Sequence, residues 1–320
     1  MKPRAIISAL LLGLAIAALD AAPAKAQNPF RSGADLRGKD LSGRNLDGAS
    51  LAGANLTGAN LSGTSFKGTD LREAYLRDVT AIGADFSGAN LGNADLTRAD
   101  LRKARLDGAS FLRADLTFAR LEKASAVKAW FGGAKLTKAR LRGADLTGAL
   151  LAAADLSQAD LRDAKLGEAD LGAAAAGHQG PKPARLRGTD LSNADLSKAN
   201  LTSADLTEAV LEKAKLVRAR LDHANLSWSR AAGADFSRAS LGWARLYAAD
   251  LKGALFQEAN LGLAQLTGSD LAGADFTGAI LSEADLSQTR LAGAKVKDAD
   301  TDDLLLGAAR DIPADLKRPN

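Results

Sequence analysis

Aspartate recurs through this sequence directly before leucine or phenylalanine, at intervals that are multiples of five residues. Regularly spaced carboxylates could provide a general acid and base pair, or could bind a cation if they stacked on one another. A reactive site, however, interrupts a repeat instead of recurring with it. We therefore predict that these aspartates bond to neighbouring backbone and solvate the surface. They include Asp95, Asp100, Asp145, Asp155, Asp160, Asp195 and Asp205.

The other residues that could carry chemistry form no catalytic motif. The two histidines, His178 and His223, are not at ligand spacing, and the chain has no cysteine. Disulfides, thiolate metal sites and cysteine nucleophiles are therefore excluded. The HExxH, G-x-S-x-G and phosphate-loop motifs do not occur either. We expect a protein that is not an enzyme and that uses no cofactor, no metal and no small-molecule substrate.

The stretch 84–121 shows the element that carries these aspartates. Written in fives it reads ADFSG, ANLGN, ADLTR, ADLRK, ARLDG, ASFLR, ADLTF and ARL. Leucine or phenylalanine at every fifth position fits neither an α-helix of period 3.6 nor a strand of period 2. The same register continues from Leu36 to Leu291. Such persistence predicts a repeat architecture.

Units of the form A(D/N)LXX in one unbroken register resemble the pentapeptide-repeat family, roughly over residues 34 to 300. The resemblance implies an all-β solenoid, a right-handed quadrilateral β-helix with four pentapeptides, about 20 residues, per coil. It also implies that the central residue and the residue two before it point inward. The expected core includes Leu96, Leu101, Leu106, Phe111 and Leu116.

The phenylalanines provide an independent test of four units per coil. Seven of the nine occupy central positions, in sets whose members are twenty residues apart. A coil of twenty residues would stack each set as a column of rings at about the 4.8 Å spacing of neighbouring strands. The sets are Phe66 with Phe86, Phe111 with Phe131, and Phe236 with Phe256 and Phe276.

The first residues are typical of a secretory signal peptide. Lys2 and Arg4 precede an apolar run over residues 5–19, and Ala24 and Ala26 frame an A-x-A cleavage site. A run of this length is short for a membrane span. We expect an exported mature chain, periplasmic or extracellular, without a membrane span; retention of the segment as an anchor stays open. Removing it lowers the formal net charge from +4 to about +2.

The predicted organisation is a signal peptide at 1–26, a lead-in at 27–33, the β-helix at 34–301 and a C-terminal cap and tail at 302–320. An irregular loop of small residues, glycine and proline interrupts the helix at 173–184. Two alternatives remain for this loop. It either bulges out by ten residues, which would shift all later units by two sides of the coil, or it traces irregular corners.

Two local expectations follow from residue types. Glycine ends the early units, whereas Arg98 and Lys103 end later ones, so we expect the turn type to change along the helix. Acids before an apolar run predict a short helix over Asp302 to Arg310, which would cover the edge of the last coil.

A basic belt spans residues 98–142, where twelve cations face four acids. A net charge of +8 over roughly two coils could attract a polyanion of the envelope or a nucleic acid, although charge runs often only solvate a surface. The candidate contact residues are Arg98, Arg102, Lys103, Arg105, Arg120 and Lys123.

A second candidate surface is aromatic. Trp228 and Trp243 end their units and Tyr247 follows a central residue, so all three should point outward. Grouped exposed aromatic residues are typical of a protein contact, although rings can also lie flat over an alanine-rich wall.

We expect an exported, non-catalytic rod that acts as a scaffold or interaction module for an unknown protein partner. The alternative is a binder of polyanions through the basic belt. One branch of the resembled family protects DNA gyrase by mimicking acidic DNA, but this chain is net basic. Whether the ends of the rod pair two copies into a homodimer stays open.

Overall fold

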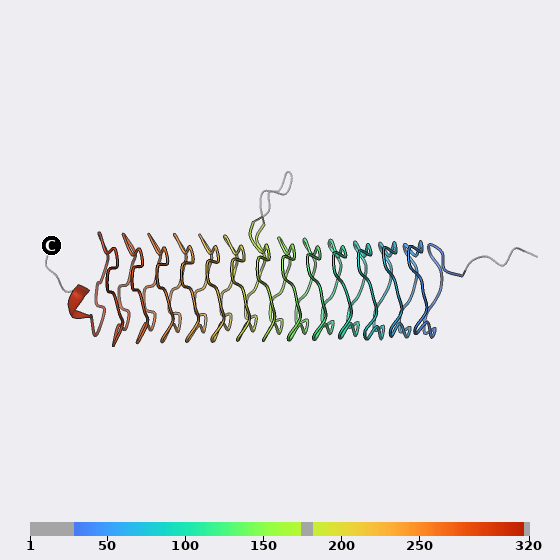
Figure 1. Ribbon diagram of the computed structural model, residues 1–320, viewed down its shortest axis with the longest axis horizontal. Helices are drawn as coiled ribbons and strands as arrows, with labels where there is room; N and C mark the ends of the chain where they lie inside the picture. Colours follow the sequence, from blue (N-terminus) through green and yellow to red (C-terminus); the bar gives the residue numbers. More distant parts are fainter. Residues whose placement is uncertain (1–28, 174–181, 317–320) are drawn as a thin grey trace, which may run out of the picture.

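The computed structural model describes residues 29–173 and 182–316, which form one elongated solenoid (Figure 1). Parallel bridges join residues that are twenty apart along most of its length, from Asp35 with Asn55 to Arg290 with Arg310. Each coil contributes four bridge residues, five apart. The structure therefore confirms a quadrilateral β-helix with four pentapeptides per coil.

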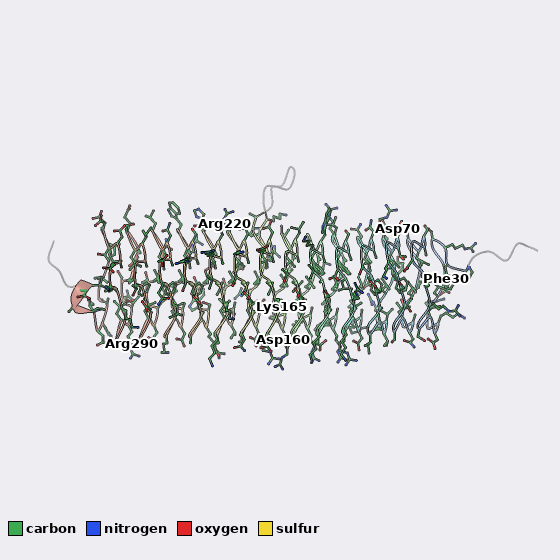
Figure 2. All side chains as sticks on the ribbon, in the orientation of Figure 1. Phe30, Asp70, Asp160, Lys165, Arg220 and Arg290 are labelled. Carbon is green, nitrogen blue, oxygen red and sulfur yellow. The ribbon has the colours of Figure 1, made fainter. Side chains whose placement is uncertain are left out.

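We number the four sides of the coil by the bridge residue with which each begins. Side 1 begins at Asp35, side 2 at Asp40, side 3 at Asn45 and side 4 at Ser50. Each side carries a column of bridge residues, one from each coil, and these side chains lie on the outside of the rod (Figure 2). The turn that follows each side is given the same number, so corner 1 lies between side 1 and side 2.

Backbone hydrogen bonds between coils hold the solenoid together. The Leu56 amide donates to the Tyr75 carbonyl at 2.8 Å, and the Tyr75 amide donates to the Ala54 carbonyl at 2.9 Å. At each corner a third bond closes the turn, as from the Ala59 amide to the Leu56 carbonyl at 2.9 Å. Buried backbone groups are thereby paired along the rod, which removes the cost of leaving them unsatisfied.

The expected change of turn type does not occur. The last residue of nearly every described unit keeps a left-handed φ whether it is glycine or not, with values of 59° at Arg98 and 58° at Lys103. A left-handed φ costs a non-glycine residue roughly 1 to 2 kcal/mol. The Lys103 amide, however, donates to the Glu122 carbonyl of the next coil at 3.0 Å. Pairing with the neighbouring coil therefore holds the turn geometry even where glycine is absent.

The core is a narrow column of leucine, phenylalanine and alanine. All five expected core residues are fully buried, and the rings stack as predicted, with centroids 4.8 to 5.0 Å apart and planes within 6°. Alanine fills the inward position two residues earlier, where the backbone approaches the axis. The core residues confirmed are Leu96, Leu101, Leu106, Phe111 and Leu116.

The coil after Leu171 contains ten extra residues, and we call this insertion the bulge. Asp155 pairs with Arg185, thirty residues later instead of twenty, and Ala184 is already buried in register. Residues 174–181 of the predicted loop lie outside the described part of the chain. Because of these ten extra residues, each later unit lies two sides away from the side that an uninterrupted period of twenty would give it. Phe236 therefore lies on side 3, the same side as Phe66.

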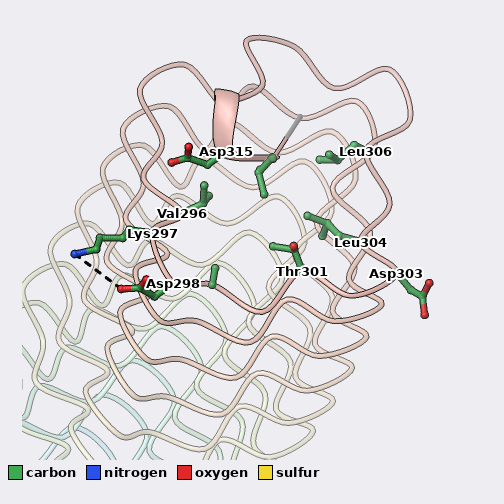
Figure 3. A pocket seen from close by; sticks show the side chains of 10 residues that line it. Val296, Lys297, Asp298, Thr301, Asp303, Leu304, Leu306 and Asp315 are labelled. Atoms are coloured by element: carbon green, nitrogen blue, oxygen red, sulfur yellow. Dashed lines mark ion pairs between the residues drawn. The ribbon is translucent and has the colours of Figure 1, made fainter. Parts of the chain in front are cut away.

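The predicted helix over Asp302 to Arg310 is wrong. Leu305 and Arg310 continue the bridges, so the coils extend to residue 310 and not to 301. The five-residue period persists there, and pairing with the previous coil satisfies the backbone more fully than an isolated short helix would. The 3-10 helix η2, Ala314–Leu316, follows (Figures 1 and 3). Leu316 packs on the end of the core.

Candidate interaction surfaces

The recurring aspartates bond to backbone, as predicted. Asp95 accepts hydrogen bonds from the Thr97 amide at 3.0 Å and from the Thr97 hydroxyl, and Asp145 accepts the same pair from Thr147. Partial burial acts to raise the pKa of Asp95, but the bonds from Thr97 together with the ion pair to Arg77 at 2.8 Å outweigh it, and the pKa is lowered. At Asp160 the bond from Arg162 is the largest effect and also lowers the pKa. These carboxylates are held ionised, which does not suit proton transfer.

We predict that acid destabilises the rod through these carboxylates. Their folded pKa values lie below the ordinary 3.8, so the stability that they contribute is present above about pH 4 and is lost as pH falls through the folded values. Thermal unfolding midpoints measured from pH 7 to pH 2 should fall at the acid end. Asp95→Asn with Asp145→Asn keeps an acceptor for the turn and should reduce the fall; an unchanged midpoint down to pH 2 would contradict the assignment.

The cavities among the described residues lie towards the C-terminal end of the rod. One of them, of about 640 Å³, is the open end of the core beneath η2 (Figure 3). Apolar side chains such as Val296 and Leu306 line it together with Lys297, Asp298, Asp303 and Asp315. Within residues 29–173 and 182–316 no three His, Cys, Asp or Glu side chains cluster in a way that could hold a metal ion. No helix in these ranges is long and apolar enough to cross a membrane.

The structure places the three candidate aromatic residues at two neighbouring corners. Trp228 and Tyr247 meet edge to face at corner 1, with ring centroids 5.6 Å apart. Trp243 lies at corner 4, stacked on His223 at 5.2 Å. Side 1 separates the two pairs. Because Trp228 and Trp243 are each more than half exposed, both corners offer rigid aromatic surface to a partner.

A further apolar cluster lies on side 4 and was not singled out from sequence. Trp130 and Leu150 are neighbours in the column of bridge residues, and Leu112 lies at the adjoining corner 4. Their exposed fractions are 50%, 42% and 43%. The cluster could have been found, because Trp130 and Leu150 are twenty residues apart and both occupy the position that usually holds Asp or Asn.

The basic belt wraps around the rod and is partly neutralised. Arg98 pairs with Asp78 at 2.6 Å, and Arg102 pairs with Asp100 at 2.7 Å. Weaker pairs hold Arg105 to Asp85 at 3.9 Å, and Arg120 to Asp100 at 3.5 Å and Glu122 at 3.8 Å. Of the six predicted contact residues, those without an ion pair in the described part of the chain are Lys103 and Lys123. These two lie one coil apart at corner 2.

Comparison with known proteins supports the same architecture. A family model for pentapeptide repeats matches the chain in overlapping windows over residues 32–174 and 184–300. The gap between these ranges falls at the ten-residue bulge. A search of curated proteins found no match.

Several solved structures are similar to the chain. HetL from the cyanobacterium Nostoc sp., a pentapeptide repeat protein involved in heterocyst differentiation regulation, is 30% identical over 79% of this chain and 89% of that one, with a TM-score of 0.27. A pentapeptide repeat protein of the Arabidopsis thaliana thylakoid lumen is 29% identical over 40% and 72%, with a TM-score of 0.16. The plasmid-mediated fluoroquinolone resistance protein QnrB1 is 18% identical over 59% and 88%, with a TM-score of 0.28.

Proposed function

Because this chain belongs to the pentapeptide-repeat family, we propose that it is an exported, non-catalytic rod that binds a protein partner through side chains on its outer wall. The exposed aromatic pairs at corners 1 and 4 carry this proposal. Aromatic residues dominate the binding energy of many interfaces, and rings held on a rigid frame lose little conformational entropy on binding. Export rests on the signal-like residues 1–26, which lie outside the described part of the chain.

Combined substitution of Trp228→Ala and Trp243→Ala tests the aromatic surface. Loss of a central interface anchor costs about 2 kcal/mol or more, so the double variant should bind its partner at least about 30-fold more weakly. Capture from an envelope fraction of the source organism, quantified band by band against wild type, gives the measurement.

Val127→Ala provides the control. Val127 is half-exposed at corner 3, on the half of the circumference that carries neither tryptophan. Its loss should leave capture unchanged. If the double variant captures the same protein as strongly as wild type, the aromatic corners are not the contact.

A polyanion is the second candidate partner, supported by the free cations Lys103 and Lys123 stacked at corner 2. Affinity for heparin or duplex DNA should then fall steeply as salt rises, because binding releases counterions. Reversal of both lysines to Glu should weaken binding and reduce the salt slope by about 2, with Lys213→Glu at the same corner as control. A slope near zero, or equal losses in the control, would remove this candidate.

A further inference from the structure

The exposed large apolar side chains are confined to half of the circumference. In the described part of the chain all of them lie on side 4, corner 4, side 1 or corner 1. Those before the bulge are Tyr75, Leu112, Phe118, Trp130 and Leu150. None lies on side 2, corner 2, side 3 or corner 3. We call the half that carries them the apolar half.

The same confinement holds after the bulge. These later side chains are Trp228, Trp243, Tyr247, Leu263, Ile280 and Leu305. It depends on the register across the bulge, where Asp170 pairs with Asn200 thirty residues later instead of twenty. Had the ten residues of the bulge formed two ordinary sides, the later units would be rotated by half a turn, and Ile280 would continue the column of side 2 instead of side 4. The bulge therefore aligns the apolar residues of the two parts of the rod.

The charged residues also differ between the apolar half and the opposite half. Over residues 34–173 and 184–310, the apolar half carries sixteen acids and eleven cations, whereas the opposite half carries nineteen acids and twenty-four cations. Most of this acidic excess lies after the bulge, where the apolar half carries eight acids and four cations, against eight and seven before it. After the bulge the excess disfavours anionic lipid and disfavours the same part of a second copy, since like charges repel. The opposite half of a second copy offers no exposed large apolar side chain among the described residues.

We propose that the apolar half is one docking surface, made of two aligned patches, for an elongated protein whose contact face is apolar and is net basic where it meets the residues after the bulge. This inference rests on the protein-binding function proposed above and specifies its partner. The contact spans both parts of the rod, because Leu112 and Ile280 are eight coils apart, about 40 Å at roughly 4.8 Å per coil. Two patches on one rigid body then bind as a linked pair, each raising the effective concentration of the partner at the other.

Two variants of the loop distinguish the effect of aligning the two patches from any effect of the loop residues themselves. Deleting residues 174–183 joins Ala173 to Ala184, removes the bulge and keeps every unit on its present side. Replacing the same ten residues with two units of the A(D/N)LXX pattern keeps the chain length but rotates everything after Ala184 by two sides. The two variants differ in the alignment of the apolar halves, and thermal melting checks that both are folded.

Photo-crosslinking in the source organism identifies the partner. Benzoylphenylalanine at Leu112 and at Leu263 probes the apolar half before and after the bulge. Val127 and Ala232 are the matched positions on the opposite half. We expect one protein to be crosslinked at both apolar positions and at neither control. Adducts with lipid, with a second copy of this chain, or with different proteins at the two positions would overturn the inference.

The crosslinked protein is then purified and its affinity measured. The deletion variant should bind within about threefold of wild type, whereas the replacement variant should lose about 100-fold or more, because one patch then faces away. Equal affinity of both variants would overturn the single docking surface but leave the proposed protein-binding function standing. Absence of any protein adduct at all four positions would overturn both.

Discussion

Substitution of Phe256→Ala should lower the free energy of unfolding by about 3 to 5 kcal/mol. Phe256 is fully buried at the middle of a three-ring column, with Phe236 and Phe276 each 5.0 Å away by ring centroid. The change leaves a cavity in a narrow bore and removes both stacking contacts, each favourable by about 0.5 to 1.5 kcal/mol. Denaturant unfolding followed by circular dichroism gives the measurement.

Phe118→Ala is the control for this prediction. Phe118 is exposed at corner 1, and its ring contacts the Lys138 ammonium, 5.5 Å from the centroid. Losing an exposed cation–π contact costs about 0.5 to 1 kcal/mol. Similar losses at Phe118 and Phe256 would show that the column of rings does not stabilise the fold.

The second large effect is expected at the central leucines. Leu116→Ala removes a fully buried side chain and should cost about 2 to 5 kcal/mol, whereas Thr117→Ala, one residue later on the outer wall, should change stability by within about 0.5 kcal/mol. Thermal or denaturant unfolding of the two single variants decides the point. Equal losses would contradict the inward and outward assignment of the unit.

Not every outward residue is a neutral control, and Asp107 shows why. From its position in the unit alone, Asp107→Ala would be expected to change little. In the structure Asp107 accepts hydrogen bonds from the Ser125 hydroxyl and the Val127 amide of the next coil. We expect its loss to cost about 1 kcal/mol. The outer wall therefore contributes to stacking of the coils where side chains bridge them.

The residue types of the core vary little from coil to coil, and most of the sequence variation lies on the outer wall. The coils repeat a core of Leu and Ala, with Phe at seven central positions and Thr or Ser at a few inward ones, while the outer positions vary from aspartate to tryptophan. A rod of this kind can present charged and aromatic groups at defined spacing without a pocket.

The repeat and its core could be predicted from sequence because each unit contains the same pattern of residue types. Leucine at every fifth position, alanine two residues before it and rings twenty apart specify four units per coil, and Leu96 and Phe111 are buried as expected. These features depend only on contacts between neighbouring coils, which the local period encodes. The C-terminal helix was predicted wrongly because an apolar run after acids is ambiguous, and pairing with the previous coil decided it.

Only the tertiary structure showed which residues, far apart in the sequence, lie on the same side of the outer wall. Whether the loop bulged or joined the coil changed the side on which Trp228, Trp243 and Ile280 lie, and composition could not choose between the two. Pairing of Arg98 with Asp78, twenty residues earlier, likewise depends on the stacking of the coils. Sequence by itself determined the coil, its period and its dry core. The tertiary structure determined the alignment of its surfaces, because the small rotations of many coils and one bulge add up only in three dimensions.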